Sequence, residues 1–302
     1  MKFYIVDAFA EHIFGGNPAG VIMIESGEYP SFDIMLKTAA ELGFSETAFV
    51  KDLGGDKYEL RYVTPTDEVD LCGHATIASF SIIGNAKGIK DGDINTYTAV
   101  TKAGEINIQV SKDLVMMDMA TPQIIGEIQS RQTWNEIRQI MGLDSRGVPG
   151  SNGAAPLSNI SPAIVSTGLP DILLPVDTKD ELNSISPDFD RLSKLSEEKQ
   201  VVGVHAFTIT GIDGDYDIHC RNFAPLYGIP EEAATGTANG ALTYYLRTKG
   251  IIENGTKNSI IQGEAMERPS KIISICEEDS DGNSAIKVGG NAATLAEGHI
   301  SL

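Results

Sequence analysis

The sequence predicts an α+β fold of two pseudo-symmetric domains, each a curved mixed sheet wrapped around a central helix. Three observations carry this prediction. Four short motifs occur twice in the same order, each half of the chain holds a matching helix, and short β-branched runs surround these helices. The runs lack the regular strand–helix alternation of a doubly wound parallel sheet, so that class is disfavoured.

The duplication rests on four motifs that recur at similar spacings, unlike a short-period repeat array. In the first half they read GNPAGVIM (Gly16–Met23), SETAFV (Ser45–Val50), RYVTP (Arg61–Pro65) and LCGHATIA (Leu71–Ala78). In the second half they read GLPDILLP (Gly168–Pro175), GVHAFTI (Gly203–Ile209), RNFAP (Arg221–Pro225) and ATGTANGA (Ala234–Ala241). Each motif alone could arise by chance, but four in the same order indicate two domains of one fold.

Local patterns predict the other elements. SFDIMLKTAAELG is typical of a helix with Ser31 as N-cap and Gly43 as C-cap. Its counterpart SPDFDRLSKL predicts a helix with Ser186 as N-cap and Pro187 at the first helical position. A helix is expected in TWNEIRQIMG, and a loop over DSRGVPGSNGAAPLSN after it. Strands are expected from alternating or β-branched runs at residues 2–9, 19–24, 46–51, 58–63, 105–111 and 114–119.

Two further helices begin at Cys72-Gly73-His74-Ala75 and at Thr235-Gly236-Thr237-Ala238, and both are rich in small residues. Small side chains let the strands approach closely, so each helix is expected to run through the middle of its own sheet. A first-turn glycine permits close approach of a ligand, and the unpaired N–H groups there favour a carboxylate. If a pseudo-twofold axis relates the halves, both helix starts point into one interdomain cleft.

Titratable side chains near these helix starts are the candidates for proton transfer. Glu46 lies at a strand end and His74 in the first helical turn, while Glu231 and Glu232 come just before the second helix. Taken singly, His74 is more often structural or solvated, and the three glutamates are more often solvated strand-edge or first-turn acids. Their placement in a duplicated pattern favours one shared site.

The composition favours a soluble, cytoplasmic protein that binds a small molecule. A formal net charge of −19 disfavours nucleic-acid and anionic-membrane partners. No apolar run is long enough for a membrane span, and the first residues do not resemble a signal peptide. The three cysteines, Cys72, Cys220 and Cys276, are far apart and show no zinc spacing, so neither a metal site nor a disulfide framework is expected.

Other chemistries lack their sequence signatures. A G-x-S-x-G elbow is absent, which disfavours a hydrolase. FGGNPAG is too short and misplaced for a dinucleotide or P-loop fingerprint, and the five histidines are not at ligand spacing.

Six segments along the whole chain carry a resemblance to a known family. They are VDAF…GNPAGV (Val6–Val21), FSETAFV (Phe44–Val50), RYVTPTDEVDLCGHAT (Arg61–Thr76), GIPEEAATGTANG (Gly228–Gly240), QGEAMERPS (Gln262–Ser270) and VGGNAATLAEGHI (Val288–Ile300). Together they resemble the PhzF-like proteins of phenazine biosynthesis, which have the diaminopimelate epimerase-like fold. The resemblance implies a homodimer, an active site in the interdomain cleft, an N-terminal domain of residues 1–120 plus about 283–302, and a C-terminal domain of residues 121–282.

The resemblance also implies a cofactor-independent isomerase that moves a proton on a small, aromatic or cyclic carboxylic acid. In it Glu46 is the catalytic acid/base, and His74 and Glu232 are catalytic partners. The substrate-binding residues it implies are Asn17, Gly73, Gly236 and Thr237. The family's epimerase cousins carry catalytic thiols at the positions of Gly73 and Gly236, and Cys72 comes one residue too early, so a two-thiol racemase is disfavoured.

The sequence departs from the family pattern near the second helix. It reads EEAATG where the family has E-D-P-x-T-G, so Glu232 is one methylene longer than aspartate and the proline is lost. A displacement of about 1 Å is enough to change a rate where positioning matters. Asn239 also replaces the commoner SAH pattern, and both changes are expected to line the pocket. Two alternatives stay open: an amino-acid or hydroxy-acid epimerase using Glu46 and Glu232, and a small-acid-binding protein without turnover.

Overall fold

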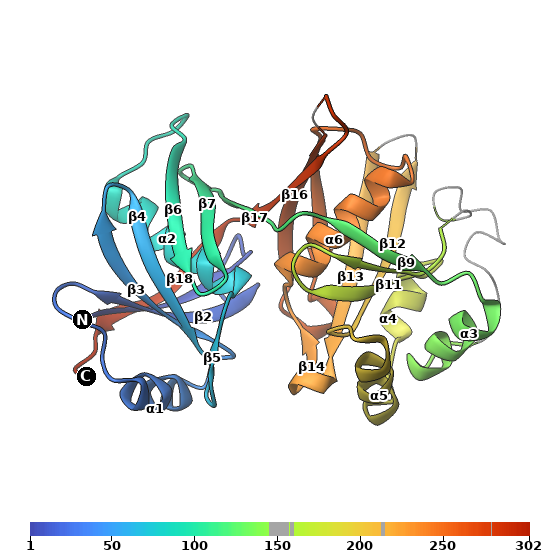
Figure 1. Cartoon of the computed structure of the whole chain (residues 1–302), viewed down its shortest axis with the longest axis horizontal. Coiled ribbons are helices and arrows are strands. Elements are labelled where there is room, and N and C mark those ends of the chain that lie inside the picture. The colour runs from blue at the N-terminus through green and yellow to red at the C-terminus, as the bar shows by residue number, and fades with distance from the viewer. Residues whose placement is uncertain (145–156, 158–159, 213–214, 279) are drawn as a thin grey trace. The chain divides into compact units, whose positions relative to one another are not determined.

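The structure is a computed structural model that describes all residues except 145–156, 158–159, 213–214 and 279 (Figure 1). The chain divides into two compact units, one of Met1–Asp118 with Gly289–Leu302 and one of Met119–Val288. The loop expected over DSRGVPGSNGAAPLSN lies, apart from Asp144 and Leu157, outside the described residues. Among the helices of the described ranges, none has both the length and the hydropathy needed to cross a membrane.

The first unit contains two helices and a sheet. Its elements are β1 (Lys2–Ala8), β2 (Asn17–Ile24), α1 (Phe32–Leu42), β3 (Thr47–Gly54), β4 (Lys57–Val63), β5 (Glu68–Val69), α2 (Gly73–Lys87), β6 (Asn95–Thr101), β7 (Gly104–Val110), β8 (Val115–Asp118) and β18 (Ala292–His299). The strands expected from the sequence form, and their bounds shift by three residues or fewer at each end.

The second unit contains the remaining elements. They are β9 (Gln123–Glu127), α3 (Arg131–Ile140), β10 (Ala163–Ser166), β11 (Pro170–Pro175), α4 (Lys179–Ser184), α5 (Phe189–Lys199), β12 (Val204–Ile212), β13 (Asp215–Ala224), β14 (Ile229–Glu232), α6 (Gly236–Thr248), β15 (Lys257–Gln262) and β16 (Ser270–Glu278), with the short 3₁₀ turns Pro225–Tyr227 and Glu264–Met266. The chain returns to the first unit within β17 (Ser284–Gly290).

The strands of the two units belong to one 18-stranded sheet and follow the same pairing scheme within each unit. In the first unit β18–β1 and β1–β2 are antiparallel, β2–β3 parallel, β3–β4 antiparallel, β4–β6 parallel and β6–β7 antiparallel. In the second unit β9–β10 and β10–β11 are antiparallel, β11–β12 parallel, β12–β13 antiparallel, β13–β15 parallel and β15–β16 antiparallel. The repeated motifs therefore reflect a repeated mixed arrangement of strands, as the α+β prediction required.

In each unit the strands enclose a central helix, α2 or α6 (Figure 1). In α2 the residues Ala75, Ile77, Ala78 and Phe80 are all buried, although they point in different directions around the helix. The helix contacts strands β1, β2, β3, β7, β8 and β18. Gly84 shows why small residues are needed, since a Cβ there would lie 2.7 Å from the Val110 side chain. The expectation of a central helix is met in both units, because α6 is buried in the same way.

Helix ends test the capping predictions. Ser31 accepts a hydrogen bond from Ile34 N at the start of α1, and Gly43 ends the helix with φ of 72°, as expected. The prediction for α5 is wrong, because its N-cap is Asp188 rather than Ser186. Ser186 N instead donates to Met141 O, so Ser186 belongs to a long-range backbone pairing.

Candidate active site

Glu46 is the residue directly before β3, where β3 runs parallel to β2. Its side chain is 16% exposed, and its Oε2 lies 3.3 Å from Nε2 of His74. His74 occupies the first turn of α2 and is 4% exposed. The fold therefore brings together two residues that are 28 positions apart in the sequence (74 minus 46), as the sequence interpretation expected of them.

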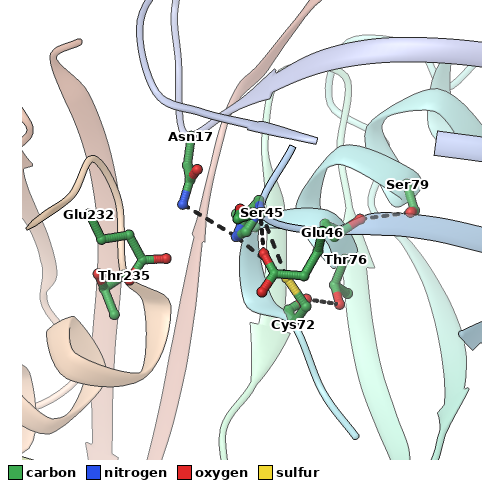
Figure 2. Close-up of polar contacts among 10 residues, drawn as sticks. Asn17, Ser45, Glu46, Cys72, Thr76, Ser79, Glu232 and Thr235 are labelled. Atoms are coloured by element: carbon green, nitrogen blue, oxygen red, sulfur yellow. Dashed lines mark hydrogen bonds and ion pairs between the residues drawn. The ribbon is translucent and has the colours of Figure 1, made fainter. Parts of the chain in front are cut away.

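Burial favours the neutral imidazole of His74. Burial lowers the pKa of His74, and the nearby Glu46 carboxylate opposes this shift without cancelling it. Asn17, at the start of β2, places Nδ2 at 3.3 Å from His74 Nδ1. An amide NH₂ only donates, so Nδ1 accepts and Nε2 carries the proton that faces Glu46. Figure 2 shows this group with Ser45 and Cys72 beside it.

Ser45 and Cys72 also touch the imidazole. Ser45 Oγ lies 3.5 Å from His74 Nε2, and Cys72 Sγ lies 3.4 Å from Nδ1 and 3.9 Å from Nε2. The sequence interpretation gave neither residue a role. Both stood inside the SETAFV and LCGHATIA motifs, which was the signal that could have identified them.

The starts of α2 and α6 are built alike. Neither N-cap side chain, Cys72 or Thr235, caps its helix. The residue at the fourth helical position bonds to the N-cap carbonyl instead, Thr76 Oγ1 to Cys72 O at 2.7 Å and Asn239 Nδ2 to Thr235 O at 2.8 Å. The first-turn N–H groups in both units therefore keep their capacity to bind an anion.

Glu232 is held by a polar network in the second unit. Its Oε2 accepts from Thr235 Oγ1 at 2.6 Å, and its carbonyl accepts from Gln262 Nε2 at 2.7 Å (Figure 2 shows Glu232 and Thr235). Gln262 Oε1 in turn accepts from Asn239 Nδ2 at 2.7 Å. Gln262 was noted only as part of a motif, and its role here was missed.

Glu231 and Glu232 lie on the short strand β14, just before the second helix as expected. One expectation about this region needs correction. Asn239 was expected to line the pocket, but its side chain is fully buried and supports the turn at Thr235. Gly236 and Thr237 do form the first turn of α6, and Thr237 O accepts from Thr167 Oγ1 at 2.9 Å.

The carboxylate of Glu231 differs from that of Glu232 because an arginine holds it in an ion pair. Arg221 donates to both Glu231 carboxylate oxygens, with Nε–Oε1 and Nη2–Oε2 distances of 2.8 Å. The repeat-related Arg61 holds Glu68 in the same bidentate way. The Glu231 carboxylate is therefore engaged by Arg221, whereas the Glu232 carboxylate accepts from Thr235.

Three side chains with possible donor atoms also lie close together in the first unit. Glu46, Cys72 and His74 each offer one donor atom, and these atoms lie within 4.8 Å of one another. The sequence showed no zinc spacing because Glu46 comes from a different motif than the other two.

Comparisons with known proteins agree with the resemblance seen in the motifs. Residues 6–298 match the family described as phenazine biosynthesis-like protein (PhzC-PhzF). A Clostridium acetobutylicum protein named uncharacterized isomerase is 32% identical, over 99% of this chain and 97% of its own. The trans-2,3-dihydro-3-hydroxyanthranilate isomerase of Pseudomonas fluorescens is 28% identical, over 100% of this chain and 99% of its own.

A solved structure supports the fold. The PhzF-family phenazine biosynthesis protein of Bacillus anthracis superimposes with a TM-score of 0.85 at 23% identity, covering 100% of this chain and 99% of that one. At this identity the likeness concerns the fold alone.

Proposed function

The chain belongs to the PhzC-PhzF family of phenazine biosynthesis-like proteins, and from this premise we propose that Glu46 is the acid/base of a cofactor-independent isomerisation. The enzyme class, an isomerase, agrees with the names of the relatives. The substrate we propose is a small cyclic or aromatic carboxylic acid, of the kind named for the Pseudomonas fluorescens relative.

The proposed reaction begins when the Glu46 carboxylate removes a proton from a substrate carbon. The C–H electron pair moves into a new double bond, and the displaced π electrons collect in an enolate-like system. The N–H groups at Gly73 and His74 stabilise the negative charge on oxygen. The protonated Glu46 then returns the proton to a second carbon, so the double bond shifts and no group is lost or gained.

One observation carries this proposal: His74 Nε2 lies 3.3 Å from Glu46 Oε2, while Asn17 Nδ2 lies 3.3 Å from Nδ1 on the other side of the imidazole. A carboxylate that receives a single donor keeps lone pairs free to accept a proton. The neutral imidazole orients Glu46 without neutralising it. Glu46 is thus held but still able to act as a base.

Replacement of the base tests the proposal. Glu46→Gln keeps the shape and the contact with His74 but cannot accept a proton, so we expect the rate to fall by about 10²–10⁴-fold. The measurement is ¹H NMR of substrate-proton exchange in D₂O, with small cyclic carboxylic acids found first by thermal shift. Glu41→Gln, an exposed residue at the end of α1, is the matched control. A loss smaller than about tenfold would remove Glu46 from the role of base.

Glu232 is the proposed second catalytic carboxylate, with Thr237 and Gly236 as substrate-binding residues. Its support is the network of Thr235 and Gln262, which holds the carboxylate in one orientation. Glu232→Gln separates two enzymatic outcomes, because NMR distinguishes a shifted double bond from inversion at one carbon. Inversion that needs both glutamates would identify an epimerase instead.

A binding protein without turnover is the second candidate function, and one contact favours it. Thr235 Oγ1 donates to Glu232 Oε2 at 2.6 Å, which occupies one carboxylate oxygen. Tight binding of an aromatic acid with no deuterium incorporation would support this candidate. Exchange that disappears in Glu46→Gln would exclude it.

The homodimer that the resemblance implied is part of the same proposal. Sedimentation equilibrium at several protein concentrations would give twice the chain mass if it is correct. A concentration-independent monomer would refute this part and leave the assignment of Glu46 untouched.

A further inference from the structure

The second unit has an exposed apolar surface where α5 contacts the 3₁₀ turn Pro225–Tyr227. Figure 1 shows α5 at the same end of this unit as β14, the strand that follows the turn. Tyr227 is 64% exposed, Phe189 42% and Leu226 39%. We call these three side chains the α5 patch. Single exposed hydrophobic residues are ordinary, but three on two contacting elements form a surface that a partner can cover.

The repeat shows that the fold itself does not require this patch. In the first unit the connection from Pro65 to the arginine-bound Glu68 contains two residues, a threonine and an aspartate. In the second unit the connection from Pro225 to the arginine-bound Glu231 contains five residues, Leu226–Pro230, and none of them is charged. The second unit is therefore three residues longer at this point, and two residues of the patch lie in the longer connection.

The surroundings of the patch are electrically balanced, although the chain has a net charge of −19. Helix α5 has three acidic and three basic residues, and residues 225–230 have none of either kind. The corresponding parts of the first unit, α1 and residues 65–70, together have five acidic residues and one basic residue. Two acidic chains repel each other, so the neutral surface at α5 is where two copies can approach at a low electrostatic cost.

The exposed face of α5 is also complementary to itself in charge. Arg191 and Glu198 are both exposed and are seven positions apart (198 minus 191), which is about two helical turns, so they lie on one stripe of the helix. Within the described ranges, neither side chain has an opposite charge at ion-pair distance. A twofold axis through the middle of the stripe brings Arg191 of each copy to Glu198 of the partner subunit, and so forms two ion pairs.

We propose that the α5 patch and the stripe of Arg191 and Glu198 form a twofold interface between two copies of this chain. Apolar side chains at the centre and charged side chains at the rim are the usual anatomy of an interface. A second copy fits better than an unrelated partner, because a twofold interface uses one surface twice and that surface has to complement itself. The inference rests on the homodimer of the proposed function, but it does not depend on the role of Glu46.

A charge placed in the patch is the first test, measured by sedimentation equilibrium of the full chain at several concentrations. Tyr227→Glu should raise the dissociation constant of the dimer by at least about 30-fold, the loss typical of an aromatic residue at the centre of an interface. Tyr227 is exposed, so the variant should fold, which circular dichroism checks. Phe32→Glu is the matched control, because Phe32 is the exposed first residue of α1, as Phe189 is of α5. It should dimerise as the unmodified chain does.

Exchange of the two charges is the second test, and it separates an interface from a loss of stability. Arg191→Glu places two acidic residues opposite each other, and Glu198→Arg places two basic residues opposite each other, so each variant should shift the equilibrium toward monomer. The double variant Arg191→Glu/Glu198→Arg restores both ion pairs and should restore the affinity of the unmodified chain. Both positions are exposed on α5, so the fold should tolerate all three variants.

The outcomes distinguish this interface from the rest of the proposed function. If Tyr227→Glu dimerises as tightly as the unmodified chain, or if the double variant fails to regain affinity, the interface is wrong and the homodimer stands. An unmodified chain that stays monomeric overturns the interface and the homodimer together. Deuterium exchange that requires Glu46 is measured separately, so its absence would refute the isomerisation and leave the interface in place.

Discussion

At the scale of single residues, burial sets the protonation of groups far from the start of α2. Asp171 on β11 is 1% exposed, and burial raises the pKa of its carboxyl to about 7, while a hydrogen bond from the Gly203 backbone opposes the shift. His205 on β12 is fully buried, and desolvation lowers its pKa to about 4. Asp171 Oδ1 and His205 Nε2 have no hydrogen-bond partner among the described residues. Burial therefore favours the neutral form of both side chains.

Asp171 makes the stability of the protein depend on pH in a direction unusual for an acid. Its folded-state pKa is raised, so the folded state binds the extra proton, and this stabilisation is full below about pH 4 and lost as the pH rises to 7. The loss amounts to about 4 kcal/mol. Asp171→Asn removes the titrating carboxyl, so the difference in free energy of unfolding between the two chains should change steadily from pH 4 to 7. Urea unfolding at several pH values measures this difference.

His205 contributes in the same pH range with the opposite sign. Its pKa is lowered in the folded state, so its contribution is lost as the pH falls from about 6.5 to 4. The Asp171→Asn comparison cancels this term, because His205 is present in both chains. A constant difference between pH 4 and 7 would mean that Asp171 is ionised in the folded state.

At the scale of elements, two arginines from the repeated motifs differ in the groups that they bind. Arg221 binds Glu231 and also donates from Nη1 to the carbonyls of Leu182, Asn183 and Ile185, at the C-terminal end of α4. Arg61 binds Glu68, which keeps Lys102 at 2.9 Å as a second partner. Both units therefore contain the ion pair, and in the second unit the arginine also caps the C-terminal end of α4.

Arg221→Gln should therefore destabilise the protein more than Arg61→Gln. Loss of Arg221 leaves Glu231 largely buried without its charge partner and uncaps α4, at a cost of about 3–5 kcal/mol. Loss of Arg61 should cost only about 1–2 kcal/mol, because Lys102 remains beside Glu68. Urea denaturation followed by circular dichroism measures both. Equal losses would show that the contacts with α4 add nothing to the ion pair.

Elements also show what the sequence could and could not predict. Strands and central helices were predictable because periodicity and small residues act locally. The start of α5 was not, because Ser186 N and Asp188 N donate to Met141 O and Ile140 O, which come from the end of α3. That pairing holds the segment extended until Asp188, whose carboxylate accepts from Arg191 N at 3.1 Å. Long-range backbone pairing overrode a good local signal.

The candidate site likewise contains residues that the sequence could indicate and supporting contacts that it could not. The proximity of Glu46 and His74 was predictable because motifs mark both residues, whereas the catalytic roles of Glu46, His74 and Glu232 stay predictions. The supporting contacts of Ser45, Cys72 and Gln262 depend on side-chain geometry across different elements, and no local pattern reports that.

At the scale of the whole molecule, the first unit is discontinuous. β18 pairs with β1 along its length, from Lys2↔His299 to Ala8↔Ala292, and Met1 O accepts from Ile300 N at 3.0 Å. β1 lies between β18 and β2 in the sheet and needs both partners. Residues 289–302 are thus a structural part of the first unit.

A chain that ends at Val288 should lose the first unit and keep the second. Without β18 the backbone groups on one edge of β1 are unpaired, so hydrogen exchange in β1 and β2 should become fast. Exchange in β12 and β13 should change little, because their pairing lies within 119–288. Removal of only Ser301 and Leu302, both exposed, is the control. Slow exchange in β1 of the shortened chain would contradict this view of β18.

The return of β18 to β1 also has a consequence for biosynthesis. On the ribosome, residues 119–288 emerge as one uninterrupted stretch and hold strands β9 to β16, so the second unit can finish folding while translation continues. The first unit, although its first strands are translated earlier, keeps an open edge on β1 until β18 leaves the exit tunnel. The order of synthesis is therefore the reverse of the order of completion, and the nascent chain depends longest on protection of β1.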